Sequence, residues 1–314
     1  MRLGVAALGA IGALAWSSSA GAYCRTMSCE LGEDPTKPCA RDRNDCVTEG
    51  KPLHWVNSCL KYAVQADGSP RSGLDADQIQ VFVEQAFNAW KTAPCPGGGT
   101  PRFEVQFQGF VSCDQREAVC GGPDRNVNVV MFHDSGWRDG SGRLGVTTPT
   151  GGTESGLVLD ADLEINSQDY SFKSDASGTM SISLLYVLTH ELGHFLGLAH
   201  SNVNSSVMSA GYQSLPFSPN LITSDDAAAI CAAYPPGEAL SCGAPPAPAY
   251  DTCQLTPGEA PPCTLSSVTQ DASSCGCDLA RSSRRRTVPS LAALGLMLAA
   301  LRTRRARAKR PNPG

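Results

Sequence analysis

The spacing of apolar residues predicts a first long helix over residues 75–90. Its apolar positions follow one another at intervals of three and four, which places them in one stripe on a helix surface. The stripe consists of Ile79, Phe82, Val83, Ala86, Phe87 and Trp90. Asp75 and Gln78 precede it at the spacing of a helix cap and its reciprocal partner, so the helix is expected to begin there.

Two further helices are predicted in the second half of the chain. Residues 179–196 form a long segment with apolar residues on more than one side, typical of a buried helix. Residues 223–233 are rich in alanine and open with Thr223, Asp225 and Asp226. A hydroxyl at the cap and acidic side chains in the first turn favour a helix N-terminus.

Candidate strands precede the first helix in the sequence and also lie between the first and the second helix. Residues 53–64 are rich in strand formers, residues 102–110 alternate apolar and polar positions, and residues 127–132 and 156–165 are further candidate strands. The order is strand, helix, several strands, helix, helix. This order predicts an α+β fold with a mixed sheet and three helices.

The first 22 residues are interpreted as a secretory signal peptide. Arg2 provides a positive start, residues 3–16 are apolar, and residues 20–22 are small, as signal cleavage sites require. The alternative is an uncleaved membrane anchor. The apolar run of about 14 residues is short for that role, because a spanning helix needs roughly 20.

The last 40 residues differ from the rest of the chain. Cys275 and Cys277 are followed by an apolar run over residues 288–301 and then by a cluster of arginines. Residues 275–314 resemble the C-terminal sorting segments of exported myxobacterial proteins, which join a cysteine signature, an apolar helix and an arginine cluster. The resemblance implies anchoring at the cell surface. A plain membrane tether, or a basic amphipathic tail on an anionic surface, are the alternatives.

Between the ends, cysteines and prolines divide the chain. The 14 cysteines indicate an oxidising, extracytoplasmic compartment. Residues 23–50 are polar and hold four of them, so we expect a disulfide-held N-terminal extension. Residues 235–274 hold eight prolines and three cysteines and are expected to form a stalk. The globular domain is then residues 51–234.

Net charge argues against a nucleic-acid partner. The whole chain carries 25 basic and 30 acidic residues, but ten of the basic residues lie in 281–314 and one is Arg2. The body over residues 23–280 therefore holds 14 basic against 30 acidic residues. Such a surface repels phosphate backbones, so we expect no binding to DNA or RNA.

The segment most informative about chemistry is His190-Glu191-Leu192-Gly193-His194-Phe195-Leu196-Gly197-Leu198-Ala199-His200. His190 and His194 are four apart on a predicted helix, so both imidazoles lie on one face and can reach one ion. Gly197 allows the chain to leave the helix with a positive φ, and His200 can then return as a third ligand. Three imidazoles leave the fourth position of a tetrahedral zinc ion open, which is typical of a catalytic site.

This segment resembles the zinc motif HExxHxxGxxH of the metzincin metallopeptidases. Metzincins also have a methionine turn beneath the zinc, and Met208, eight residues past His200, fits that role. Filling of the core is the alternative use of Met208. The resemblance implies a metzincin-like α+β fold with a small C-terminal subdomain below the zinc cleft, and one catalytic Zn²⁺ held by His190, His194 and His200.

Within the metzincins the chain is most similar to the matrixin branch. Ser201 directly follows the third histidine, and Tyr212 lies four residues beyond the methionine, as in matrixins. Ala210 occupies the place where the astacin-like and serralysin-like branches have a metal-binding tyrosine. Residues 221–234 resemble the closing helix of matrixin catalytic domains, and residues 53–62 resemble their first strand.

The chain also departs from the matrixins of animals. Those proteins hold a second, structural zinc on several further histidines, whereas His54 and His133 are the only ones left here. We therefore expect this second site to be absent. A long pro-domain is missing as well. Cys24 or Cys29 could imitate the family's latency cysteine and make residues 23–50 a short pro-segment, but disulfide bonding is the favoured interpretation.

A calcium site is a further possibility at the end of the strand near residue 160. Asp160 and Asp162 are followed by Glu164, and clustered carboxylates of this kind can hold Ca²⁺. A solvated strand edge in an acidic protein is the alternative and the favoured interpretation.

The resemblance implies hydrolysis of protein or peptide substrates, with Glu191 as the general base. Substrate is expected to pair with the strand around residues 144–148, and the loop over residues 213–220, with Leu215 to Phe217, to line an apolar pocket. The chain is expected to act as an exported, surface-anchored monomer. Two alternatives stay open: a non-catalytic adhesion module that keeps zinc for stability, and a zinc hydrolase acting on an amide other than a peptide.

Overall fold

A computed structural model describes most of the central part of the chain. The described residues are 22–32, 36–112, 116, 127–173, 182–212, 221–237, 240 and 242–243, together with the backbone of 278–279. Both the signal-peptide prediction, apart from residue 22, and nearly all of the C-terminal sorting segment fall outside these ranges. Among the described residues no helix combines the length and apolar character needed to cross a membrane.

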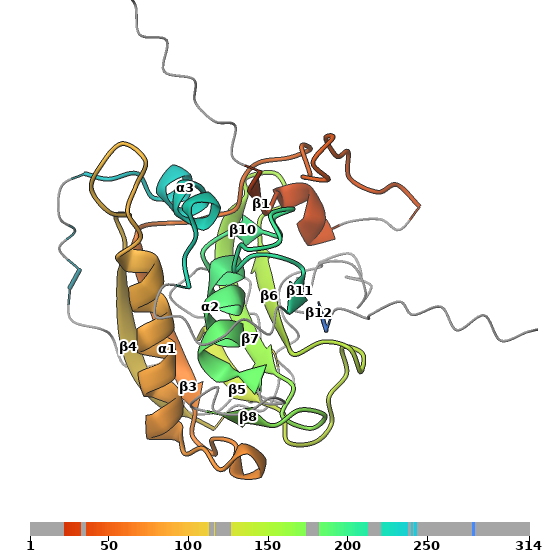
Figure 1. Cartoon of the computed structure of the whole chain (residues 1–314), viewed down its shortest axis with the longest axis vertical. Coiled ribbons are helices and arrows are strands. Elements are labelled where there is room, and N and C mark those ends of the chain that lie inside the picture. Colours follow the sequence, from red (N-terminus) through yellow and green to blue (C-terminus); the bar gives the residue numbers. More distant parts are fainter. Residues whose placement is uncertain are drawn as a thin grey trace, which may run out of the picture. The chain divides into compact units, whose positions relative to one another are not determined.

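A six-stranded mixed sheet forms the centre of the fold (Figure 1). Its strands run in the order β2-β7-β5-β3-β4, all parallel, and β6 pairs with β7 in the antiparallel sense. The strands are β2 (His54–Trp55), β3 (Cys59–Gln65), β4 (Glu104–Val111), β5 (Val129–Phe132), β6 (Gly145–Gly151) and β7 (Leu157–Ile165). The predicted α+β class with a mixed sheet is therefore confirmed.

The single strand predicted over residues 53–64 is wrong in one respect, because the structure divides it into β2 and β3. The break has a local cause: the Asn57 side-chain oxygen accepts a hydrogen bond from the Cys59 amide at 2.8 Å. Such an Asx turn competes with strand pairing and redirects the chain. β2 consequently pairs with β7, whereas β3 pairs with β4 and β5.

Helices α1 (Ala76–Lys91) and α2 (Leu184–Phe195) lie side by side and cover the sheet (Figure 1). The predicted cap of α1 is present, with reciprocal hydrogen bonds between Asp75 and Gln78. The apolar stripe faces inward, and at its end the Trp90 indole donates to the Thr189 carbonyl oxygen of α2 at 2.8 Å. The stripe thus fixes α1 against α2, the helix that carries the motif.

The second helix begins later than the predicted residue 179. Ser183 is its cap, since its hydroxyl accepts from the Tyr186 amide at 3.3 Å. Residues 182–183 form the short strand β9 (Ile182–Ser183), which pairs with β8 (Phe172–Lys173), and residues 179–181 lie outside the described ranges. Met180 and Ile182 precede the cap, so apolar positions do not stop where the helix begins. The pattern alone therefore could not locate the cap.

The third helix, α3 (Ser224–Ala233), begins as predicted at Thr223, which forms a reciprocal cap with Asp226. Four short strands form two further pairs outside the large sheet. β10 (Leu198–Ala199) follows α2 and pairs with the N-terminal β1 (Cys24–Arg25). β11 (Gly211–Tyr212) pairs with β12 (Asp278–Leu279). Two short 3-10 helices, η1 (Ser28–Gly32) and η2 (Pro70–Ser72), complete the described elements.

Four disulfides join described cysteines, as an exported chain permits. Two close the N-terminal extension, Cys24–Cys46 and Cys29–Cys39. The other two close much longer loops, Cys59–Cys242 and Cys95–Cys231, with sequence separations of 183 and 136 residues. Cys24 and Cys29, the candidate latency cysteines, are thus both in disulfides, and the favoured interpretation of residues 23–50 as disulfide-held is confirmed.

Candidate metal centre and active site

The structure brings His190, His194 and His200 together at the end of α2. Their ligand atoms all lie within 4.8 Å of one another, and the three ring centroids are 4.8 to 5.2 Å apart. The first two histidines come from α2 itself. Among the residues that the structure describes, this is the only group of three or more histidine, cysteine or acidic side chains close enough to hold a metal ion.

Backbone carbonyls orient the two helical imidazoles. His190 Nδ1 donates to the Val207 carbonyl oxygen at 2.6 Å, and His194 Nδ1 donates to the Leu198 carbonyl oxygen at 2.8 Å. With the proton on Nδ1, each neutral ring presents an Nε2 lone pair, and the two Nε2 atoms are only 3.1 Å apart. Converging lone pairs repel one another unless a cation lies between them. The donor set therefore fits a divalent metal such as zinc.

Burial keeps these imidazoles in the form that binds metal. His190 is fully buried, and burial together with the nearby His200 lowers the pKa of His190 to about 3. Burial and the two neighbouring imidazoles also lower the pKa of His194 well below its ordinary value. Both rings are consequently neutral at physiological pH, and neutral imidazole is the ligand form.

Gly197 ends the helix in the way the sequence predicts. Its φ is +87°, in the left-handed region that favours glycine, and a Cβ there would lie 2.9 Å from the Leu53 carbonyl oxygen. The chain turns here into β10 and returns toward α2. His200 follows β10 directly, which is why its ring faces the other two.

Glu191 lies next to the first histidine and is fully buried. Thr147, on β6, donates from its hydroxyl to the Glu191 side-chain oxygen Oε2 and is also 2.9 Å from the Glu191 backbone oxygen. A Cβ at Gly145 would lie 3.0 Å from Glu191 Oε1, so the absence of a side chain there leaves room for the carboxylate. Neither Thr147 nor Gly145 was identified from the sequence, because nothing local connects β6 to residue 191.

Met208 is in close contact with α2 at Gly193, the residue just before the second histidine of the motif. A Cβ added at Gly193 would lie 2.2 Å from Met208 Sδ and 3.0 Å from Trp90 Cζ2. Gly193 therefore lets the methionine pack directly against the backbone of α2. The turn is further fixed to the histidine loop, because the Ser201 amide donates to the Met208 carbonyl oxygen at 2.8 Å.

Asp226 on α3 organises this turn and was missed as a site residue. Its carboxylate is 1% exposed and accepts from the Val207 amide at 3.1 Å, the Thr223 hydroxyl at 2.7 Å and the Ser206 hydroxyl. Since the Val207 carbonyl oxygen orients His190, a chain of contacts links α3 to the metal centre. The sequence identified Asp226 only as a residue favourable to a helix N-terminus.

Tyr212 supports the other end of α2. Its hydroxyl accepts from the Ser183 amide at 3.0 Å, directly at the helix cap, and its ring packs edge-on against Tyr186 with centroids 5.3 Å apart. The predicted supporting residues Gly197, Met208 and Tyr212 thus all contact α2 or its C-terminal turn. Tyr212 itself lies away from the histidine nitrogens, at the start of the helix.

The interpretation of Asp160 and Asp162 as a solvated strand edge is wrong. Both are 1% exposed and lie inside β7, which pairs with β6 along almost all of its length. Asp162 accepts from the Val129 amide at 2.9 Å and so helps to hold β5 in the sheet. Calcium binding at these aspartates stays a prediction.

The two remaining histidines have contacts of their own. His133 Nε2 lies 2.7 Å from Glu164 Oε1, and His54 Nδ1 donates to the Pro52 carbonyl oxygen at 3.2 Å. The absence of a second structural zinc stays a prediction. Of the predicted substrate strand over residues 144–148, residues 145–148 form the start of β6, and substrate pairing there stays a prediction. The predicted pocket loop 213–220 is outside the described residues.

These features define a class of protein. An α+β sheet carries a helix with two histidines and an adjacent glutamate, a glycine turn returns a third histidine, and a methionine turn lies beneath. Together they are the architecture of the metzincins.

Comparison with known proteins indicates which branch of the metzincins the chain resembles. Residues 127–235 match a family model described as matrixin. The chain is 41% identical to matrilysin of Rattus norvegicus over 79 residues, which is 25% of this chain and 28% of that protein. It is 28% identical to matrix metalloproteinase-C of Caenorhabditis elegans over 200 residues, covering 60% and 30% of the two chains. It is 27% identical to metalloendoproteinase 1-MMP of Arabidopsis thaliana over 199 residues, covering 61% and 47%.

The region that carries the site is therefore matrixin-like. The chain spans less than half the length of each of these relatives, and the matched family model covers residues 127–235, from just before β5 to just after α3.

Replacement of Gly193 tests the packing beneath the metal centre. We expect Gly193→Ala to lower the free energy of unfolding by about 1–3 kcal/mol, because a new methyl group would overlap Met208 in a close-packed region. Urea denaturation measures the change. Gly142→Ala is the control, since a Cβ at Gly142 meets no atom within 4 Å. Equal stabilities for both variants would contradict the packing described here.

Proposed function

We propose that the chain is a zinc-dependent endopeptidase that cleaves peptide bonds of protein substrates. One observation carries the proposal: three buried or half-buried imidazoles converge on one point, and a carboxylate lies next to the first of them. The match of residues 127–235 to the matrixin family supports the same reaction class. Neither non-catalytic adhesion nor hydrolysis of another amide has a specific observation in its favour.

His190, His194 and His200 would hold the ion. Zinc bound there supplies a Lewis acid that polarises the scissile carbonyl and lowers the pKa of a water molecule to about 7. The protein residues orient the ligand atoms and fill the space around them. The carbonyl oxygens of Val207 and Leu198 keep the Nε2 atoms directed at one point, and Met208 fills the space below.

Glu191 carries the proton. In the proposed mechanism its carboxylate accepts a proton from the attacking water as the new carbon–oxygen bond forms. It then delivers this proton to the leaving nitrogen as the carbon–nitrogen bond breaks, which yields a carboxylate and an amine. Thr147 fixes the carboxylate by its hydrogen bond to Oε2, and the space above Gly145 leaves the other oxygen room.

The substrate would add a strand to β6. Within the described part of the chain, β6 pairs with β7 alone, so its second edge offers backbone donors and acceptors to an extended peptide. Thr147 lies on this strand and donates to Glu191, so a peptide paired with β6 would lie next to Glu191. The loop 213–220, with Leu215 to Phe217, belongs to the proposal as the wall of an apolar pocket for the residue after the cut.

Removal of the carboxylate charge tests the mechanism. We expect Glu191→Gln to retain zinc and to lose at least about 10²-fold in casein or gelatin cleavage, because an amide cannot accept the proton. Wild-type cleavage should stop when a chelator is added. Glu154→Gln is the control, since Glu154 is exposed and outside the site. Substantial activity in the Glu191 variant would refute its role as base.

Metal analysis tests the number of sites. We expect one zinc per folded chain, because the described residues provide a single three-histidine group. Inductively coupled plasma mass spectrometry on the dialysed protein measures the ratio. Two tightly held zinc ions per chain would contradict the predicted absence of a structural site.

Export and surface anchoring are part of the proposal. The four disulfides are consistent with an oxidising compartment, and the cysteine, apolar and arginine pattern of residues 275–314 resembles a sorting segment. If this segment is processed, mass spectrometry of the mature surface protein should lack residues 290–310. Their recovery from the exposed protein would instead indicate a retained tether.

A further inference from the structure

The N-terminal extension is paired directly with the loop that delivers the third histidine. β1 and β10 form an antiparallel pair in which Cys24 faces Ala199 and Arg25 faces Leu198. β10 is the whole stretch between the glycine turn at Gly197 and the ligand His200. The path of the chain between the second and the third ligand is therefore set by contacts with residues 24–26.

Arg25 bridges the carbonyl of the glycine turn and a backbone carbonyl of the segment that leads into β2. Its Nε donates to the Gly197 oxygen at 3.0 Å, and its Nη2 donates to the Leu53 oxygen at 2.7 Å. A planar guanidinium can hold two acceptors in a fixed geometry, which a lysine cannot. The side chain thus connects the glycine turn to the chain that leads into β2.

Thr26 adds a link to the second ligand. Its amide donates to the Gly197 oxygen at 3.1 Å, and its hydroxyl donates to the Leu198 oxygen at 3.0 Å. The same Leu198 oxygen accepts from His194 Nδ1 at 2.8 Å. A carbonyl oxygen has two lone pairs, so Thr26 and His194 can share it. The carbonyl that orients His194 is consequently held from its other side by the N-terminal extension.

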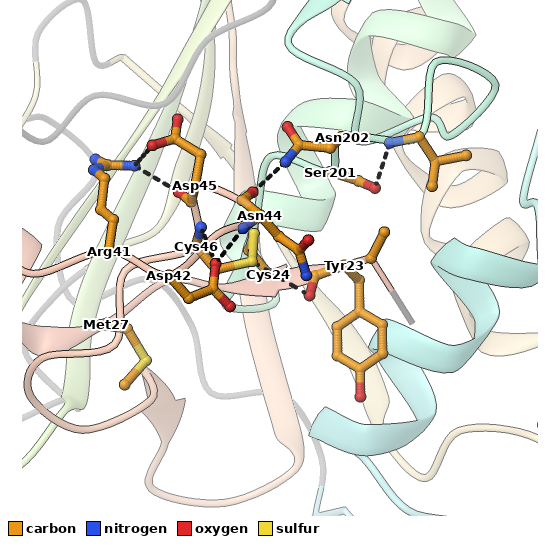
Figure 2. The surroundings of a disulfide bond; sticks show 12 residues. Tyr23, Cys24, Met27, Arg41, Asp42, Asn44, Asp45, Cys46, Ser201 and Asn202 are labelled. Carbon is orange, nitrogen blue, oxygen red and sulfur yellow. Dashed lines mark hydrogen bonds and ion pairs between the residues drawn. A yellow bond between two sulfur atoms is a disulfide. The ribbon is translucent and has the colours of Figure 1, made fainter. Parts of the chain in front are cut away.

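A disulfide fastens this segment (Figure 2). Cys24, in β1, is bonded to Cys46, and the Cys46 sulfur lies 3.7 Å from the Tyr23 oxygen. The loop that the bond closes also reaches past the third ligand, because the Asn202 side chain donates to the Asn44 carbonyl oxygen. Residues on both sides of His200 are thereby in contact with the extension.

From these contacts we infer that residues 23–26, fastened to residues 44–46 by the Cys24–Cys46 disulfide, are a permanent clamp that positions His200 and His194 for metal binding, and that Arg25 is its main positioning residue. The inference rests on the three-histidine metal site of the proposed function. It assigns the extension a role opposite to that of a removable pro-segment, since its loss would loosen the metal loop. Outer contacts of this kind are worth roughly 10- to 100-fold in metal affinity.

The test measures the rate at which the purified, exported chain releases zinc to a colorimetric chelator. Arg25→Met is expected to raise this rate roughly 10- to 100-fold. Arg25→Lys keeps the charge and one donor and should lie between Arg25→Met and the wild type. Release from Arg25→Met at the wild-type rate would overturn the clamp, whereas a wild-type chain that holds no zinc would overturn the metal site as well.

The two disulfides provide a matched comparison. The double variant Cys24→Ser with Cys46→Ser should release zinc faster, whereas Cys29→Ser with Cys39→Ser should lose thermal stability without faster release, because its bond closes the loop around η1 rather than β1. Equal release rates in the two double variants would refute the clamp. Should the first variant fail to fold, Arg25→Met and Arg25→Lys decide alone.

N-terminal sequencing of the active, exported chain gives an independent readout. A mature chain that still contains Cys24 is expected. A zinc-loaded, active form that begins after residue 50 would overturn the inference and restore the interpretation as a pro-segment.

Discussion

The active site depends on two hydrogen bonds from imidazole Nδ1 atoms to backbone carbonyls. They select one tautomer for His190 and His194 and direct both Nε2 atoms to the same point, 3.1 Å apart. Without them each ring could rotate or exchange its proton, and the ligands would not be preorganised. Each of these two residues is held in turn by a distant element: the Val207 amide donates to Asp226 of α3, and the Leu198 carbonyl oxygen accepts from Thr26 of the N-terminal extension.

This arrangement makes the metal centre a meeting point of segments far apart in sequence. α2 supplies two of the three histidines, the turn after it supplies the third, and β6 supplies Thr147, which holds the Glu191 carboxylate. α1 adds the Trp90 contact to the backbone of α2 next to His190. The helix is therefore supported along its length by side chains whose own positions are fixed by burial.

Short-range features of the fold could be predicted from the sequence, and long-range contacts could not. The spacing of His190 and His194, the glycine turn and the caps at Asp75 and Thr223 each follow from residues within one or two helical turns. Thr147, Asp226 and Arg25 contact Glu191, Val207 and Gly197, which lie 44, 19 and 172 residues away, so no local pattern indicates them. The start of α2 was misplaced because apolar residues continue across its cap, and Asn57 divided a strand that composition alone presents as continuous.

The disulfide between Cys59 and Cys242 would have a mechanical consequence if the proposed C-terminal anchoring holds. Tension on the chain beyond residue 242 would enter the body covalently at the first residue of β3, in the middle of a six-stranded sheet. The backbone path runs through α3, which is the helix that holds the methionine turn. This path would carry only part of the load. Shear from a surrounding medium would then reach the sheet first, at a distance along the chain from His190, His194 and His200.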